Sequence, residues 1–538
     1  MGSSLWDLIE HQKLLLMIVV LGIGGSLQAG FQGTMITYTS VHVKMFINNS
    51  WLERSGLPVH PETLTLLWAL VVSIFGLGGL LGTLASGYLT TKFGKKKCLV
   101  ANNVAMLASA SLMGFSKMSK SLELILVGRF LSGISTGICI PLHPQYVGEI
   151  SPKKLRGFAN STASVFWSLG KVLGQVMGQR ELLGSASLWP LLMASTGLAA
   201  SIQLLTLPFF PESPPHLFLQ KGDEEGCLKA MKTLWGDSLA LQAELDDLRK
   251  QQAALQRSTR SKSVLELLKA PALRWQLFFL VLVVVAMQLS GIHVVEYYLR
   301  VPPRKPPSSN KLRGKEQEKN QRFKLKYFSQ EIYNYTFEVL HTVGFDDEDI
   351  PYLSLGLSLS ELLSAVVCSF IIDRFGRKVL LWGGFGLMAT VLAAVTLTIS
   401  LQPWFSWMPY CSLFLIFCVV IFFGIGPAGA AASLRMEIFD QSSRSSAYVI
   451  GGVLNWVGIF VIGMLFPFVV ERLHQFSFLI FMGALYISGF IIYFFLPETK
   501  GKSILEIREE FDKLNFKKKQ ILTLETNFTE ECVFCTKL

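Results

Sequence analysis

Long apolar runs alternate with short polar segments along most of this chain. A helix that spans a bilayer needs about 20 mostly apolar residues. Twelve stretches meet that requirement, at 13–34, 65–90, 97–116, 122–142, 159–180, 188–209, 272–297, 351–372, 379–401, 409–433, 446–470 and 476–496. The pattern therefore predicts an all-α membrane protein with twelve transmembrane helices.

A long polar stretch divides the twelve runs into two sets of six. It covers 213–270, where apolar residues recur at helical spacing among mixed charges, which is typical of surface helices. Landmarks before and after it repeat in the same order, 282, 288 and 286 residues apart: Gly94 and Gly376, Glu149 and Glu437, Pro211 and Pro497. We therefore expect two similar halves at 1–212 and 271–500, joined by linker helices at 213–270 and followed by a tail at 501–538.

Composition and charge agree with a membrane protein. The chain is 51% hydrophobic and only 16% charged, with a mean hydropathy of +0.44. Its net charge is +11, but the basic residues form short clusters between apolar runs. The positive-inside rule places such clusters in the cytosol, so we expect both termini and the linker there and no nucleic-acid partner. The glycosylation sequon at Asn48 then lies in the first outer loop, about 35–64.

A set of short motifs identifies a family. GRFLSGISTG, PQYVGEISPKKLRG, PESP, QLSGI, DRFGRK, GIGP, LNW and PETKGK follow one another along the chain. In this order they resemble the facilitative hexose transporters among the sugar porters of the major facilitator superfamily, and the tail is most similar to the fructose-transporter-like class II branch. The resemblance implies two rocking six-helix halves in the plasma membrane and a small sugar as substrate. No P-loop, metal-ligand cluster or nucleophile–base pair is evident, so we predict neither an enzyme nor a cofactor, and no motif indicates an oligomeric state.

The resemblance also assigns site residues. It implies substrate contacts at Gln288, His293, Glu361, Asn455, Trp456 and Ser164, and an outer gate at Tyr297 and Tyr298. It further implies a network of ion pairs at the inner ends of the helices, made by Glu149, Arg156, Asp373, Arg374, Arg377, Glu437 and Arg444. The simpler alternatives are helix–helix hydrogen bonding for Gln288 and plain helix capping for the inner charges. Two departures from the family pattern, Thr91 in place of Asp and Pro215 in place of Arg, predict a weaker network in the first half.

The substrate and the transport mode follow less directly. Proton-coupled sugar porters carry Asp in the first span, where this chain has Gln32, and a glutamine cannot carry the proton. We therefore expect uniport of a hexose, fructose and/or glucose. Several sugar-binding amides of the family are replaced here, so two alternatives stay open: transport of an organic anion such as urate, and a sensor or defective relative that transports nothing.

An insertion is predicted at 299–327. This segment is rich in Pro, Lys and Arg without an apolar period, which is typical of disorder, and removing it leaves a family-like join. It is either a retained intron or gene-model error, or a real outer loop, and sequencing the transcript across codons 298–328 separates the two readings.

The replaced amides generate a pH prediction. His293 and Glu361 are ionisable groups inside spans, where charge is costly, so we expect them to approach each other across the cavity. The alternative is that both bind water. Because histidine has an ordinary pKa of about 6.5, His293→Asn should flatten the pH profile of transport between about pH 5.5 and 7.5. A variant that keeps the unmodified profile contradicts the pairing.

Overall fold

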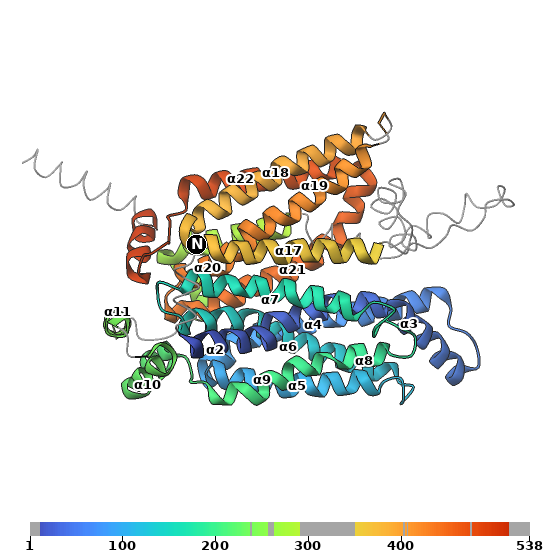
Figure 1. Ribbon diagram of the computed structural model, residues 1–538, viewed down its shortest axis with the longest axis horizontal. Coiled ribbons are helices and arrows are strands. Elements are labelled where there is room, and N and C mark those ends of the chain that lie inside the picture. Colours follow the sequence, from blue (N-terminus) through green and yellow to red (C-terminus); the bar gives the residue numbers. More distant parts are fainter. Residues whose placement is uncertain are drawn as a thin grey trace, which may run out of the picture.

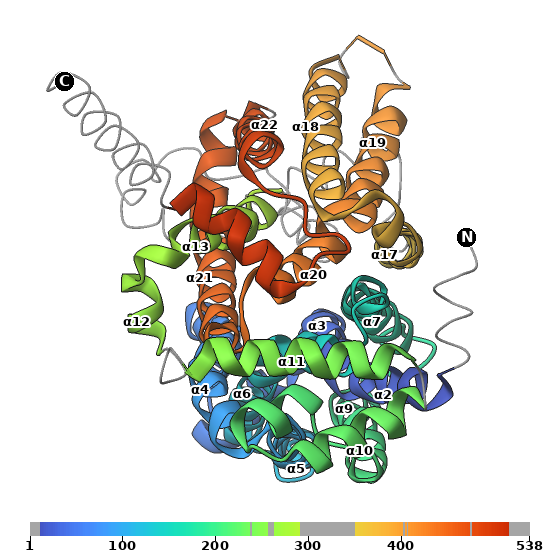
Figure 2. The same cartoon turned by 90° about the vertical axis from the view of Figure 1, so that its left-hand side faces the viewer.

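Two six-helix halves lie against each other along their length. The computed structural model describes residues 11–236, 239–256, 263–290, 350–401, 404–405, 407–473 and 476–515. The first half occupies one side of the molecule in Figure 1 and the second half the other. The helices between the halves gather at one end, which faces the viewer in Figure 2 and is called the linker end here.

The first half begins with one continuous helix. It consists of α2 (Gln12–Gly22), a π-helical turn η1 (Ile23–Leu27) and α3 (Gln28–Ser55). The remaining elements of this half are α4 (Pro61–Phe93), α5 (Lys95–Phe115), α6 (Leu122–Ile150), α7 (Arg156–Met177), α8 (Trp189–Ala194), α9 (Thr196–Thr206) and η2 (Leu207–Phe209). The polar stretch that follows forms η3 (His216–Gln220), α10 (Glu224–Trp235), α11 (Leu239–Gln256) and α12 (Val264–Lys269), as its helical spacing predicts.

The second half repeats this plan. Its elements are η4 (Pro271–Leu273), α13 (Arg274–Gln288), α17 (Ile350–Phe375), α18 (Arg377–Leu401), α19 (Met408–Phe423), η5 (Gly424–Ala428), α20 (Gly429–Ile438), α21 (Gln441–Leu473) and α22 (Ser477–Phe495). The π turn η5 makes α19 and α20 one kinked span around Pro427. Residues 504–515 form a short helix at the linker end.

The predicted all-α, twelve-helix fold is confirmed, with one span of a different character. Eleven of the described helices are long and apolar enough to cross a membrane, and α7 is the twelfth span. It is less apolar because its buried face carries Asn160, Ser168, Lys171 and Gln175. That face lies against α17 of the second half and α3 of its own half instead of lipid. We call the contact between α7 and α17 the seam, and α7 is its polar side.

The predicted outer loop at 35–64 is wrong for most of its length, because the first helix continues to Ser55. Apolar side chains recur at helical spacing along this extension: Met35, Val43 and Ile47 are buried and pack near Trp189. No helix breaker occurs before Gly56, whose φ of 70° ends the helix with a left-handed cap. The sequon at Asn48 therefore lies on a helix, where its Oδ1 accepts a hydrogen bond from the Val59 amide at 3.3 Å.

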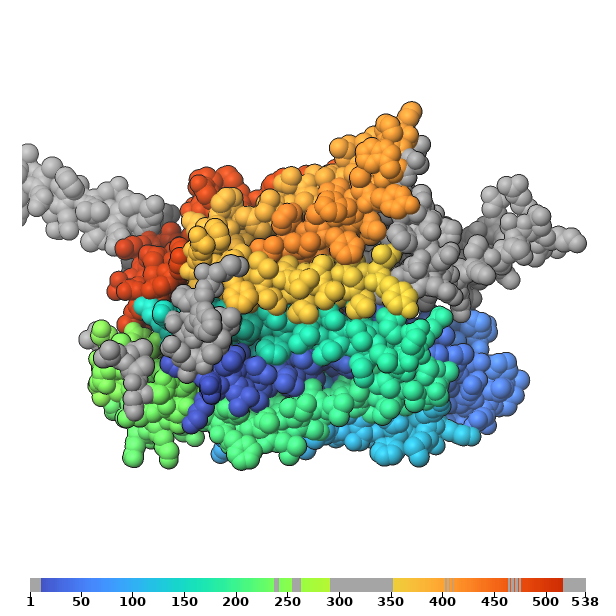
Figure 3. Space-filling view, viewed as in Figure 1, coloured from blue at the N-terminus to red at the C-terminus, as the bar shows by residue number. Residues whose placement is uncertain are grey.

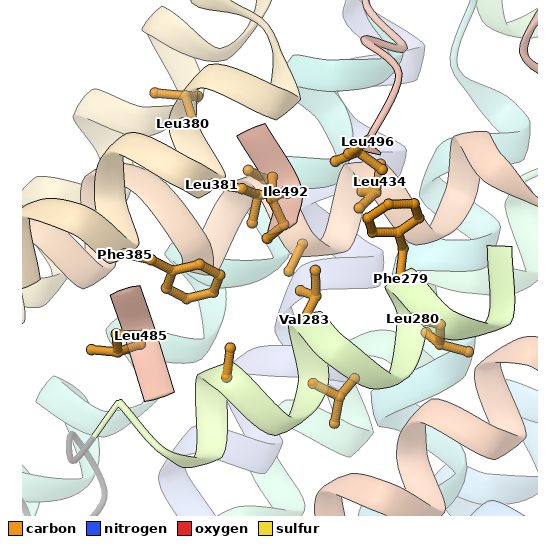
Figure 4. Close-up of a cluster of buried hydrophobic side chains, with 14 of the residues drawn as sticks. Phe279, Leu280, Val283, Leu380, Leu381, Phe385, Leu434, Leu485, Ile492 and Leu496 are labelled. Atoms are coloured by element: carbon orange, nitrogen blue, oxygen red, sulfur yellow. The ribbon is translucent and has the colours of Figure 1, made fainter. Parts of the chain in front are cut away.

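Each half has its own apolar core. In the second half, Phe279 and Val283 of α13 pack with Phe385 of α18 and Ile492 of α22, all nearly inaccessible (Figure 4). Large apolar side chains also cover the outside, for example Phe460 and Phe490 at 66% and 64% exposure. On a membrane protein such side chains face lipid. The polar groups inside the spans, which need partners there, therefore do most to determine how the helices are oriented against one another.

The sequence repeat is also a structural repeat. Gly94 and Gly376 end α4 and α17 with φ of 85° and 90°, a conformation that favours glycine. Glu212 accepts hydrogen bonds from a first-turn amide of α5 at 3.2 Å, and Glu498 does the same for α18 at 3.0 Å. In each half, the glycine thus makes the turn at the end of one helix, and a carboxylate far along the chain caps the start of the next helix.

This arrangement predicts that Gly376 tolerates no side chain. A Cβ there would lie 2.5 Å from Glu498 Oε2 and on a left-handed backbone, so Gly376→Ala should cost about 2 kcal/mol. The melting temperature of the purified protein checks this. Gly383→Ala on α18 is the control, because a Cβ there meets nothing within 4 Å. Equal melting temperatures for both variants contradict the prediction.

Candidate substrate site and gating network

Two amides predicted to bind substrate lie together. Gln288 ends α13, and its Nε2 donates to Oδ1 of Asn455 on α21 at 2.7 Å. The Gln288 side chain is buried, and its Oε1 has no hydrogen-bond partner among the described residues. A buried carbonyl oxygen without a partner is costly, so this oxygen requires a hydrogen-bond donor that the described residues do not supply. Helix–helix bonding therefore accounts for only one of the two polar atoms of Gln288.

The neighbouring Trp456 joins the two halves. Its Nε1 donates to Thr83 Oγ1 of α4 at 3.1 Å, and Thr83 in turn donates to the Gly137 carbonyl at 2.9 Å. Phe75 of α4 contacts the indole edge-on, with ring centroids 5.9 Å apart. A Cβ at Gly79 would come within 2.2 Å of the indole. Gly79 of the first half thus lacks a side chain at the place where the Trp456 indole of the second half packs.

Glu361 has partners that sequence reasoning missed. Its Oε2 lies 2.6 Å from Lys171 Nζ, and its Oε1 accepts from Ser168 Oγ at 2.9 Å. Both partners lie on α7 of the other half. The available signal was a lysine inside a predicted span, because a charge in a membrane needs a partner or a cavity. Ser164, on the same helix, donates to the Ser161 carbonyl of its own turn at 2.7 Å.

Three predicted residues lie outside the described residues. They are His293, Tyr297 and Tyr298, so the predicted pairing of His293 with Glu361 and the outer gate stay predictions.

Glu149 is the centre of one part of the predicted inner network, at the linker end. It pairs with Lys95 Nζ at 2.8 Å, accepts a hydrogen bond from Ser213, and pairs across the halves with Arg444 Nη1 at 3.4 Å. All of these side chains are buried. Beside them, burial and then the Lys95 charge lower the pKa of His216, which keeps that imidazole neutral.

Arg377 is the centre of the other part. It pairs with Asp373 at 3.0 Å and with Glu437 at 2.7 Å. The second oxygen of Asp373 accepts from the Phe158 amide at 3.1 Å, so a carboxylate of the second half caps the N-terminus of α7 in the first half. Thr91 occupies the equivalent position in the first half, and its hydroxyl donates to the Gly87 carbonyl of its own helix at 2.8 Å. Where the second half has a carboxylate that reaches α7, the first half thus has a hydroxyl that bonds within its own helix.

Two members of the predicted network lie at its edge. Arg156 approaches Glu244 of linker helix α11 at 3.8 Å, while the same carboxylate accepts from the Lys153 amide at 2.6 Å. The Arg374 side chain is exposed, and its carbonyl accepts from Lys500 Nζ at 2.7 Å. The linker helix and the tail are therefore fastened to the same ends of the spans as the ion pairs.

These features define a multi-pass membrane transporter with two similar six-helix halves, polar bonds across the middle of the seam and ion pairs at one end. The chain belongs to the sugar transporter family: the model described as "Sugar (and other) transporter" matches residues 17–301 and 330–511. The unmatched residues 302–329 overlap the predicted insertion at 299–327.

Relatives of full length support this assignment. The chain is 37% identical to human solute carrier family 2, facilitated glucose transporter member 11, over 95% of this chain and 96% of the human protein. It is 34% identical to member 5 of the rat, over 91% and 90% of the two chains. In fold it is similar to the proton:xylose symporter XylE bound to 6-bromo-6-deoxy-D-glucose, with a TM-score of 0.74, 20% identity and coverage of 93% and 99%.

The one-sided cap gives a prediction. Asp373→Ala removes the interdomain cap of α7 together with the Asp373–Arg377 ion pair. The cap alone is worth about 1 kcal/mol, so the linker end should open by a factor of about five or more. A reporter cysteine in place of the buried Ser161, at the seam, should then be alkylated about five times faster, as read by mass spectrometry. Thr91→Ala is the matched control, and similar rates in both variants contradict the assignment.

Proposed function

We propose that this protein is a facilitative uniporter of a hexose, fructose and/or glucose, that works by alternating access of its two halves. The observation that carries the proposal is the buried pair Gln288–Asn455, in which Oε1 of Gln288 has no hydrogen-bond partner among the described residues. A sugar presents several hydroxyl groups, which uncharged amides bind as both donors and acceptors. The adjacent indole of Trp456 supplies the apolar face that a sugar ring requires. The names of the relatives, facilitated glucose transporters, support the same substrate class.

The first span supports uniport. Gln32 is fully buried, and its Oε1 accepts from Arg129 Nη1 at 3.4 Å. The Arg129 guanidinium also stacks on Phe75, 4.3 Å from the ring centroid. An amide at this position cannot take up and release a proton, so the arginine has a fixed neutral partner in place of a titrating one.

The distribution of basic residues supports the proposed orientation. Lys95 and Lys96 begin α5, Arg377 begins α18 and Lys153 precedes α7. These helix starts belong to the end of the molecule where α10 and α11 lie (Figure 2). We therefore place the linker end and both termini in the cytosol and the protein in the plasma membrane. Asn48, at the opposite end of the first helix, is then available to glycosylation on the outer side.

Counterflow in proteoliposomes tests the proposal. The protein, with and without residues 299–327, is purified and reconstituted into vesicles. These vesicles are loaded with unlabelled fructose, glucose or urate and then exposed to the same compound in labelled form. Labelled fructose or glucose should accumulate transiently without a pH gradient. Accumulation of urate alone supports the organic-anion alternative and contradicts the proposal, and accumulation of none supports the non-transporting alternative.

The site makes a specific mutational prediction. Gln288→Leu removes the open acceptor and leaves Asn455 without its donor, so the KM for the transported sugar should rise about tenfold, as expected for one or two hydrogen bonds. Initial rates of uptake over a range of concentrations give the KM. Gln276→Leu is the control, because Gln276 is a buried amide on the same helix that bonds Asn515. A KM that is unchanged in Gln288→Leu contradicts a sugar contact.

A further inference from the structure

A cavity lies at the linker end, where the two halves, the linker helices and the tail helix at 504–515 meet. Figure 3 shows the linker helices (green) and the tail helix (red) next to each other at this end. The cavity has a volume of about 430 Å³, including the space at its mouth. Its lining takes residues from each of these parts of the chain, among them Glu149, Arg156, Trp235, Leu248, Arg444 and Ile504.

Two arginines of this lining have a hydrogen-bond donor to spare. The Nε atoms of Arg156 and Arg444 are buried, and neither has a hydrogen-bond partner among the described residues. A buried guanidinium N–H without an acceptor is costly, and more so because the group is charged. An occupant of the cavity that accepts hydrogen bonds would remove this cost.

The carboxylates beside the cavity are shared among more cations than they can balance. Glu149 pairs with Lys95 at 2.8 Å and with Arg444 at 3.4 Å. Glu244 of α11 approaches Arg156 at 3.8 Å, and its other oxygen already accepts from a backbone amide at 2.6 Å. In these pairs three cations share two carboxylates, and both arginine contacts are long. The cavity therefore favours an anion.

Two further carboxylates at this end of the molecule are engaged with other partners. Asp440 accepts from the Ser443 amide at 3.0 Å and lies 3.6 Å from the guanidinium of Arg508. Glu437 pairs with Arg377 at 2.7 Å. Neither carboxylate makes an ion pair with Arg156 or Arg444 among the contacts of the described residues, so the excess of positive charge at the cavity stays.

We propose that this cavity is a regulatory anion site, which takes a small phosphate or carboxylate between Arg156 and Arg444 and holds the linker end closed. Arginine suits this role because its planar guanidinium binds such groups through parallel hydrogen bonds. The two arginines belong to opposite halves, so the site is complete only while the linker end is closed. A bound anion therefore shifts the equilibrium toward that state. The site is separate from the amides at Gln288 and Asn455, and its ligand does not compete with the substrate for them.

The rate of cysteine alkylation tests the site. The protein carries a cysteine in place of the buried Ser161, at the seam, and is held in inorganic phosphate, in succinate or in sodium chloride of the same ionic strength. At saturation, phosphate or succinate should slow alkylation of this cysteine about fivefold relative to chloride, as read by mass spectrometry. The same anion should raise the melting temperature. A response to only one of the two anions assigns the ligand to the phosphates or to the carboxylates.

Two variants remove the site in different ways, and each is compared with itself in chloride. Arg156→Gln removes one guanidinium, and Gln251→Trp fills the cavity from α11, where Gln251 is a half-buried part of the lining. In both variants, phosphate and succinate should give the alkylation rate and melting temperature seen in chloride. Lys229→Gln is the matched control, because Lys229 is an exposed cation of α10 outside the lining, and this variant should respond as the unmodified protein does.

Two results would overturn the inference. One is alkylation that is as fast in phosphate and in succinate as in chloride. The other is a slowing that persists in full in both Arg156→Gln and Gln251→Trp, because the anions then act at another place or through a general effect of salts on stability. Neither readout requires transport, so a failure of counterflow contradicts the proposed function and leaves this test unchanged.

Discussion

The cost of an unpaired polar group inside a membrane governs this structure. Lipid offers no hydrogen bonds, so every polar side chain within the spans needs a partner or a cavity. Here many of these partners lie in the opposite half: Glu361 with Lys171, Trp456 with Thr83, and Asp373 with the Phe158 amide. Outside the spans the same groups would be solvated and would contribute little. Inside the membrane, a few polar side chains therefore make strong contacts that fix the position of one half relative to the other.

These contacts divide into two kinds with different duties. At the linker end, Glu149 and Arg377 gather several charges that are backed by linker helices and by the carboxylates of Glu212 and Glu498. Water can enter there when the halves move, so these bonds suit a gate that exists in one state. Deeper in the spans, the amides of Gln288 and Asn455 bond each other within the second half, and Lys171 pairs with Glu361 across the halves.

The sequence predicted the fold well because apolar runs of about 20 residues form few structures other than membrane-spanning helices. The sequence repeat of Gly94 and Gly376 is also a structural one, because both glycines have a positive φ at the end of a helix. It failed at 35–55, where the absence of a breaker before Gly56 outweighed the polar composition. It also missed Lys171, although a lysine inside a predicted span is itself a signal. Its pairing with a residue 190 positions away is fixed by the packing of α7 on α17 and leaves no local pattern. Motif comparison singled out both Gln288 and Asn455, whereas the direction of their hydrogen bond depends on how α13 packs against α21.

The central claim is that the halves must part at the far end of the α7–α17 seam during transport. Gln175 Nε2 and Ser354 Oγ bond there across the halves, so cysteines at both positions can be joined by a short reducible thiol cross-linker that replaces the length of the glutamine side chain. Counterflow by the Gln175→Cys/Ser354→Cys protein should stop on cross-linking and return on reduction, while each single cysteine variant transports under both conditions. A cross-linked protein that transports at the rate of its reduced form would contradict alternating access through this seam.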